Sequence, residues 1–387
     1  MEFEFATASR IIFGRGTVHK IAPLAAATGR RWCLVTGGSR ERAAELLGQL
    51  RRQSLEVTTL TVSGEPTTDS ALEGVSRARQ AGCEAVIGIG GGSVLDTGKV
   101  IAALLTNRGE LMDYLEVIGE GQPLSNPSAP YFAVPTTAGT GAEATRNAVL
   151  GSPTHQVKVS MRSLYMLPAV AVVDPELTYS MPPALTASTG LDAFTQLLEA
   201  FVSNQTNPMT DALCREGLQR AARSLPVTYE DGSNAQARED MSLASLFSGI
   251  VLANAKLGAV HGFAGPLGGM YPASHGAICA SLLPHVMEAN LAALQRRLPH
   301  SSALGRYTEI ARILTGKAGA EAQDGVAWVS DLCMKLNVPT LGSLGVANAD
   351  LQAVVEKSKN ASSMKGNPVR LTDSELLDVL DRALGRP

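Results

Sequence analysis

Short apolar segments alternate with amphipathic helical segments through the first 178 residues of this 387-residue chain. Strand-like runs are expected at residues 32–36, 57–62, 85–89, 131–134 and 170–173. Helical stretches include residues 40–52, 68–81 and 95–106. Because strands that are separated by helices pair in parallel through right-handed crossovers, this pattern predicts a doubly wound α/β sheet.

The pattern changes after residue 178, where helical periodicity continues without a strand-like run. Helices are expected at residues 184–202, 210–224, 239–255, 286–297, 307–315, 322–336, 349–359 and 373–384. Pro182 and Pro183 favour a break just before the first of these helices. The chain also exceeds the roughly 250–300 residues at which one core stops growing. We therefore expect an α/β domain over residues 1–178 and an all-helical domain over residues 179–387.

A glycine-rich loop follows the apolar run at residues 85–89. It contains Gly90, Gly91 and Gly92, and Ser93 is expected to cap a helix that begins near Val94. Backbone N–H groups and a helix N-terminus then point at one place, which favours an anion such as a phosphate. The loop matches neither G-x-G-x-x-G nor the P-loop motif. A tight turn without a ligand is the structural alternative.

Four polar residues of the helical region suggest a metal site. Asp192 and Gln196 are four residues apart and share one face of a helix, while His261 and His275 lie in glycine-rich segments. Carboxylate oxygen and imidazole nitrogen are ligands of divalent metals such as Zn²⁺ and Fe²⁺. Each residue singly also fits a structural role, such as a helix cap or a satisfied polar group. Their combination with a phosphate-binding loop favours the metal site.

Taken together, these segments resemble the iron-containing (group III) alcohol dehydrogenase family, which includes glycerol dehydrogenases and is related to dehydroquinate synthase. The matching stretches are residues 90–99, 135–143, 174–177, 182–192 and 261–275. The resemblance implies a dinucleotide-binding α/β domain, an all-helical metal and substrate domain, and an active site in the cleft between them. It implies hydride transfer between a nicotinamide cofactor and a primary alcohol or aldehyde, assisted by Fe²⁺ or Zn²⁺. The expected catalytic and metal residues are Asp192, His261 and His275, with Gln196 as a weak fourth ligand.

Two positions depart from the family pattern. Gln196 stands where the family has a second, histidine ligand, and Gly265 replaces a histidine close to the substrate. Either the amide oxygen of Gln196, a weaker donor than imidazole, binds the ion, or the ion keeps only Asp192, His261 and His275 while water or substrate completes the shell. Both arrangements predict weaker metal binding than is usual in the family. The absence of a side chain at Gly265 leaves space for a bulkier or differently charged substrate.

Cofactor preference is inferred from the end of the early strand at residues 32–36. NAD-specific sites commonly place an acid on the ribose 2′-hydroxyl, and such an acid repels the 2′-phosphate of NADP. Here Gly37 and Ser39 are small, and Arg40 and Arg42 follow. This favours NADP(H) over NAD(H), although the arginines also fit a solvated helix N-terminus.

The resemblance implies further cofactor contacts. Asp96 is expected near the cofactor, and Lys158 is expected to approach the nicotinamide ribose. Thr136, Thr137 and Thr140 are expected to bond the pyrophosphate and ribose side. Without the family, this threonine-containing segment is compatible with a plain loop.

The sequence also allows other functions to be considered. Gln196 and Gly265 are compatible with a metal-independent reductase of the same family, similar to maleylacetate reductase, or with a nucleotide-binding protein that has no turnover. A dehydroquinate-synthase-like lyase would need a site rich in Lys and Arg. The residues around His261 and His275 are apolar and glycine-rich instead.

The composition limits the partners and the location of the protein. A net charge of −3 provides no basic surface for nucleic acid or an anionic membrane. The five cysteines show no C-x-x-C spacing, and their odd number argues against a closed disulfide framework. We therefore expect a cytoplasmic protein that binds neither nucleic acid nor membrane. The family resemblance implies a small alcohol or aldehyde substrate, and we also expect a homodimer.

Overall fold

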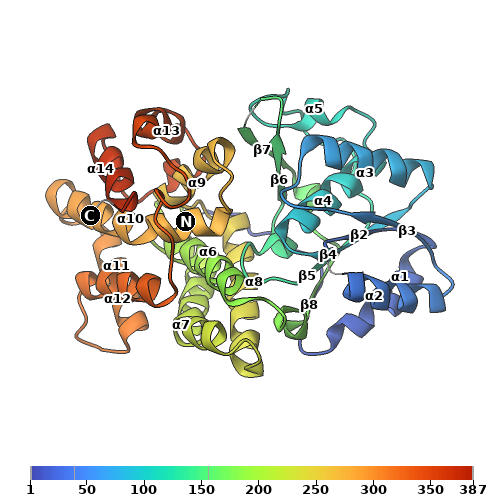
Figure 1. The fold of residues 1–387 in the computed structure, drawn as a ribbon, viewed down its shortest axis with the longest axis horizontal. Coiled ribbons are helices and arrows are strands. Elements are labelled where there is room, and N and C mark those ends of the chain that lie inside the picture. Colours follow the sequence, from blue (N-terminus) through green and yellow to red (C-terminus); the bar gives the residue numbers. More distant parts are fainter. Residues whose placement is uncertain (1, 39, 156, 386–387) are drawn as a thin grey trace. The chain divides into compact units, whose positions relative to one another are not determined.

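The structure is a computed structural model that describes residues 2–38, 40–155 and 157–385. The chain divides into two compact units (Figure 1). One unit comprises Phe5–Tyr179, and the other joins Met1–Glu4 to Ser180–Pro387.

A six-stranded sheet forms the centre of the Phe5–Tyr179 unit. Its order is β1-β8-β5-β4-β2-β3, and all neighbouring strands are parallel. The strands are β1 (Ile11–Phe13), β2 (Arg31–Thr36), β3 (Glu56–Thr61), β4 (Ala85–Gly90), β5 (Tyr131–Pro135) and β8 (Val170–Val173). The chain leaves β2 toward one edge of the sheet and leaves β4 toward the other edge. The doubly wound prediction is confirmed, and the topological switch point lies between β2 and β4.

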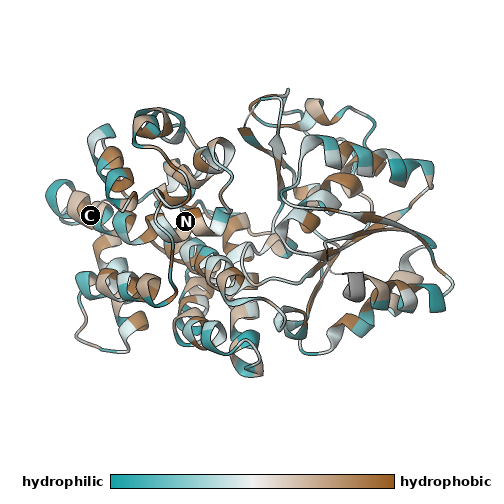
Figure 2. Cartoon of the chain, in the orientation of Figure 1, coloured by the Kyte–Doolittle hydropathy of each residue, from teal (hydrophilic) through white to brown (hydrophobic). Residues whose placement is uncertain are grey.

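Helices cover both faces of this sheet because its strands are apolar on both sides. Trp32 and Leu34 pack on one side with Ile21 of α1 (Ile21–Thr28) and Leu46 of α2 (Arg40–Arg52). Cys33 and Val35 pack on the other side with residues of α3 (Thr68–Gln80) and α4 (Gly92–Thr106). Figure 2 shows hydrophobic residues concentrated on the strands, while the helices carry both polar and apolar residues. Burial on both faces accounts for the nearly continuous apolar runs of the strands.

Three features of this unit differ from the sequence-based expectation. The short strand β1 was not predicted, and neither was the antiparallel pair of β6 (Asn147–Ser152) and β7 (Val157–Arg162). Helix α4 begins at Gly92, so Gly91 is its N-cap and Ser93 lies within the first turn. The prediction that Ser93 caps the helix is therefore wrong.

The second unit is helical, and residues 180–385 contain no strand. Its helices are α6 (Pro183–Val202), α7 (Pro208–Glu230), α8 (Ala235–Asn254), α9 (Ala259–Met270), α10 (His275–Arg297), α11 (Ser302–Thr315), α12 (Ala322–Lys335), α13 (Leu351–Ser358) and α14 (Asp373–Ala383). Helix α10 is long and apolar enough to cross a membrane, but 78% of its apolar window is buried inside the protein. That burial is characteristic of a core helix.

Two segments around the histidines are more helical than expected. The glycine-rich segment after Gly258 forms α9, and α10 begins at His275, eleven residues before the predicted start at residue 286. Both helices contain an internal proline, Pro266 and Pro284, which normally lowers helix propensity. Burial of their apolar faces outweighs this local penalty.

Candidate metal centre and cofactor loop

Three helices of the helical unit bring the predicted metal residues together. Asp192 lies in α6, His261 in the first turn of α9, and His275 at the start of α10. Gly276 permits a close approach, because a Cβ there would lie 2.3 Å from the backbone oxygen of Ser188 in α6. The start of α10 can therefore contact α6 beside Asp192.

The donor atoms of these residues point at one another. Asp192 Oδ1 lies 3.4 Å from His261 Nε2 and 3.7 Å from His275 Nε2. The side chain of Asp192 is 2% exposed, and its Oδ1 accepts no hydrogen bond within the described part of the chain. A buried carboxylate oxygen without a hydrogen-bond donor is costly unless a cation or another partner satisfies it. The three residues therefore fit a divalent metal.

Glu199 fixes the orientation of His261. Its Oε2 lies 2.7 Å from His261 Nδ1, and its Oε1 accepts a 2.7 Å hydrogen bond from the backbone N–H of Val260. A carboxylate at the N-terminus of α9 is also favoured by the helix dipole. With Nδ1–H donating to Glu199, Nε2 is the unprotonated nitrogen of neutral His261 and faces the cluster. Glu199 was not selected from the sequence, although it lies one helical turn beyond the expected ligand position Gln196.

The amide of Gln196 is turned so that its nitrogen contacts Asp192. Its Nε2 donates a 3.1 Å hydrogen bond to Oδ2 of Asp192. The amide thus holds the second carboxylate oxygen of Asp192, not Oδ1, which lies beside the imidazoles. Its own Oε1 is buried and has no hydrogen-bond partner among the described residues. Coordination by Gln196 stays a prediction.

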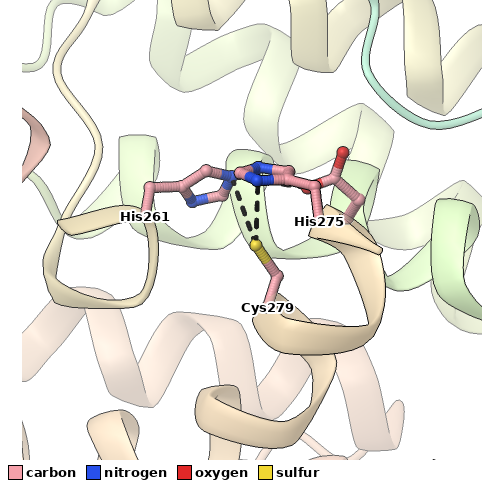
Figure 3. Close-up of side chains that lie close together, drawn as sticks. His261, His275 and Cys279 are labelled. Carbon is pink, nitrogen blue, oxygen red and sulfur yellow. Dashed lines mark hydrogen bonds and ion pairs between the residues drawn. The ribbon is translucent and has the colours of Figure 1, made fainter. Parts of the chain in front are cut away.

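A cysteine that the sequence analysis gave no role also joins the cluster. Cys279 Sγ lies 3.8 Å from His261 Nε2 and 3.7 Å from His275 Nε2 (Figure 3). Donor atoms of Asp192, His261, His275 and Cys279 all lie within 4.8 Å of one another. The available signal was the spacing of His275 and Cys279, which are four residues apart and therefore share a helix face.

The cluster shifts the protonation of its own members. Burial opposes protonation of both imidazoles, but Cys279 and Asp192 outweigh it and raise the pKa of His261 and of His275. Burial likewise opposes the Cys279 thiolate, but His275 and His261 outweigh it and lower the pKa of the thiol. Burial also opposes the charge of Asp192, but His275 and His261 outweigh it and lower the pKa of this carboxyl. The two acidic members of the cluster, Asp192 and Cys279, thus favour positive charge on the two imidazoles.

Gly265 lies one helical turn after His261 in α9. A Cβ built at this position would meet no atom within 4 Å. The side chain of His275 is 35% exposed, whereas that of His261 is 7% exposed. The cluster is therefore accessible from the His275 side, and Gly265 leaves open space on the helix that carries His261.

The glycine loop occupies the switch point of the α/β unit. A cavity of about 170 Å³ there is lined by residues at the carboxyl ends of β2, β4 and β5, including Gly37, Gly90, Gly91 and Thr136. The N-cap of α4, Gly91, provides no side-chain acceptor for the first N–H groups of the helix. Open α/β sheets bind ligands at this kind of crevice, and a helix N-terminus attracts a phosphate.

The glycines also allow close packing around the loop. A Cβ at Gly90 would lie 2.5 Å from Val94 Cγ2, and one at Gly92 would lie 3.0 Å from Thr140 Cγ2. A Cβ at Gly91 would lie 3.5 Å from Thr137, which is an ordinary contact. The structure therefore gathers Gly90, Gly91, Gly92, Ser93, Thr136, Thr137 and Thr140 around one turn.

Asp96 and Lys158 have protein partners in this unit. Asp96 Oδ1 lies 3.3 Å from buried Lys99 Nζ, and Asp96 Oδ2 accepts a 2.9 Å hydrogen bond from the N–H of Val149. Lys158 forms a 3.2 Å ion pair with Glu65. Their cofactor contacts stay predictions. Ser39 lies outside the described residues.

Comparison with known proteins defines the class of this site. Residues 8–175 match the family described as iron-containing alcohol dehydrogenase, and residues 186–384 match its C-terminal family. Alcohol dehydrogenase 4 of Saccharomyces cerevisiae is 37% identical over 82% of this chain and 80% of its own length. The NAD-dependent methanol dehydrogenase of Bacillus methanolicus is 29% identical over 96% of this chain and 97% of its own length.

A solved structure shows the same fold. The crystal structure of a 1,3-propanediol oxidoreductase has a TM-score of 0.91 and 32% identity, and the match covers 99% of this chain and 100% of the other. Together with the parallel α/β unit and the helical unit, these relatives define a nicotinamide-linked alcohol oxidoreductase. The chain belongs to the iron-containing alcohol dehydrogenase family.

Proposed function

We propose that this oxidoreductase transfers a hydride between C4 of a nicotinamide and the carbinol carbon of a primary alcohol, or to the corresponding aldehyde in reverse. The cluster of Asp192, His261 and His275 around the unpartnered Oδ1 of Asp192 carries this proposal. A divalent metal at this cluster supplies a Lewis acid that polarises the alcohol or carbonyl oxygen.

The protein contributes orientation and a defined environment to the reaction. Glu199 holds His261 with Nε2 toward the cluster, and Gln196 holds Asp192 with Oδ1 toward the imidazoles. Hydride transfer requires the two carbons to be aligned, and rigid side chains on helices provide that alignment better than loops do. The open space at Gly265 favours substrates larger than those of relatives with a histidine there.

The cofactor lies on the glycine loop in this proposal. The backbone of Gly90–Ser93 at the start of α4 would hold its pyrophosphate; the uncapped helix N-terminus and the neighbouring cavity support this assignment. NADP(H) is preferred over NAD(H), because Gly37 places no acid beside the ribose. The NAD dependence in the name of the methanol dehydrogenase relative supports a nicotinamide cofactor.

A metal-independent reductase is the second candidate, because Gln196 lacks the imidazole that the family uses for its metal. Metal analysis of protein purified without chelator, combined with a cofactor-absorbance assay over aldehydes of increasing size, separates the two. Bound metal together with NAD(P)H-dependent reduction supports the proposal. Full activity in protein without metal would establish the second candidate.

We also propose that the protein acts in the cytoplasm as a homodimer on small-molecule substrates. The apolar helix α10 is mostly buried inside the protein, and this burial supports a water-soluble enzyme. The mass of the purified protein in solution tests the dimer.

A further inference from the structure

Cys279 occupies a place in the cluster that no family ligand explains. The residue is buried, and its Sγ is within 3.8 Å of both imidazole Nε2 atoms. Figure 3 shows the sulfur directed toward the two rings, which come from α9 and α10. Cys214 of α7 is equally buried, but it does not belong to this group of donor atoms.

Four of the six separations among the donor atoms match one metal shell, and all six are within 4.8 Å. Bonds of about 2.0–2.3 Å at tetrahedral angles separate neighbouring donors by roughly 3.3–3.8 Å. The observed separations involving Asp192 Oδ1 and the imidazoles are 3.4 Å and 3.7 Å, and those involving the sulfur are 3.7 Å and 3.8 Å. A metal can therefore be accommodated without rearranging the helices.

The Gln196 side chain is engaged elsewhere. Its amide nitrogen donates to Asp192 Oδ2, whereas Oδ1 of the same carboxylate lies beside the imidazoles. This contact explains how Gln196 can be useful without coordinating the metal, because it orients the carboxylate. The buried and unpartnered Oε1 of Gln196 offers a competing oxygen donor, which the experiment must separate from sulfur.

We infer that Cys279 is the fourth protein ligand of the metal and replaces the imidazole that Gln196 lacks, so that the alcohol or carbonyl oxygen would bind as a fifth ligand. The inference rests on the metal-assisted function proposed above. Thiolate is a softer ligand than imidazole or carboxylate, so the set of Asp192, His261, His275 and Cys279 selects Zn²⁺ over Fe²⁺ more strongly than an all-nitrogen and oxygen set does. Gln196 is a positioning residue for Asp192.

X-ray absorption at the zinc edge of the zinc-loaded full-length protein tests the ligand directly. The wild type should show one sulfur neighbour at about 2.3 Å together with nitrogen or oxygen neighbours at about 2.0–2.2 Å. The cobalt-substituted protein should show a thiolate-to-cobalt charge-transfer band. Both sulfur signals should disappear in Cys279→Ala and in Cys279→Ser.

Two further variants serve as controls. Cys333→Ala removes another buried cysteine of the helical unit and should leave both sulfur signals unchanged. Gln196→Ala should keep the sulfur signals and lower zinc affinity.

Cys279→Ala should lower zinc affinity at least about tenfold, since loss of an outer partner alone has an effect of that size. Circular dichroism and thermal unfolding establish that each variant is folded.

The outcomes distinguish the inference from the function on which it rests. A zinc shell without sulfur in an active, metal-dependent wild type would overturn the role of Cys279 and leave the proposed function intact. A wild type that binds neither zinc nor cobalt and still reduces aldehydes would overturn both. Sulfur coordination that is lost specifically in the Cys279 variants supports the inference.

Discussion

Glu199 Oε2 lies 2.7 Å from Nδ1 of His261, and this contact couples the N-terminus of α9 to the candidate metal site. The same carboxylate also accepts the backbone N–H of Val260. One buried side chain therefore sets both the position of the helix and the direction of the imidazole.

Glu199→Gln should weaken metal binding because the amide cannot accept all the hydrogen bonds of the carboxylate. We expect a loss of about 10–100-fold in metal affinity, as for other partners of metal-binding histidines. Competition with a chromogenic chelator measures the change. Glu309→Gln, which alters an exposed carboxylate paired with Arg215, is the matched control. Unchanged affinity in a folded Glu199→Gln variant would contradict the orienting role.

Gly91→Ala should impair cofactor binding with little effect on stability. A Cβ at Gly91 makes only ordinary contacts with Thr137 at 3.5 Å, so the protein accommodates the methyl group. A pyrophosphate close to the backbone would be displaced by it. Fluorescence titration with NADPH measures the loss, and Gly305→Ala, which enters open space in the helical unit, is the control. Wild-type affinity in Gly91→Ala would place the cofactor elsewhere.

Gly37→Asp should shift the preference toward NAD(H). The new Cβ fits, since its nearest neighbour would be Val94 Cγ2 at 3.5 Å. The carboxylate would repel a 2′-phosphate and can accept from a 2′-hydroxyl. We expect the ratio of kcat/KM for NADP(H) to that for NAD(H) to fall at least about tenfold.

Gly37→Ala separates the effect of added volume from that of charge and should change the ratio little. An equal effect of Ala and Asp would show that the site at Gly37 does not discriminate by charge. A wild type that already prefers NAD(H) would contradict the proposed cofactor preference.

Asp240 should make the helical unit sensitive to acid. Burial opposes its charge, but hydrogen bonds from Arg223 and Ser224 outweigh burial and lower the pKa of Asp240. A carboxyl with a lowered folded-state pKa stabilises the fold above its unfolded pKa of about 4 and loses that contribution as pH falls through the folded value. Asp240→Asn should therefore destabilise the protein at neutral pH by about 1–3 kcal/mol.

Urea unfolding at several pH values tests this assignment. The difference in unfolding midpoint between the wild type and Asp240→Asn should be largest near neutrality and should shrink below about pH 4. A difference that stays constant with pH would mean that the contacts of Asp240 do not depend on its charge.

Much of the parallel sheet could be predicted because its central strands are buried on both faces. The runs around Val86 and Phe132 are continuously apolar, and helices separate them. Strand β1 has only three residues, and β6 has two polar residues and one glycine among its six, so neither has a clear local signal. Their pairing depends on distant partners.

The candidate metal site was only partly predictable, because it too depends on residues that are distant in the sequence. Asp192, His261 and His275 belong to residue types with known metal chemistry, and the family resemblance pointed to them. Glu199 and Cys279 gain their roles from helix packing, which brings α6, α9 and α10 together. Glycines and an internal proline also concealed α9, because local propensity disfavours a helix that tertiary contacts stabilise.

Removal and return of the metal test the central claim most directly. The purified enzyme is stripped with a chelator, dialysed, and assayed for alcohol-dependent reduction of NAD(P) while one divalent metal is titrated back. The account predicts that activity disappears with the metal and returns as one equivalent of Zn²⁺ or Fe²⁺ binds, and that Asp192→Ala stays inactive at the same metal concentration. Full activity of the stripped wild type would contradict a metal-assisted alcohol dehydrogenase.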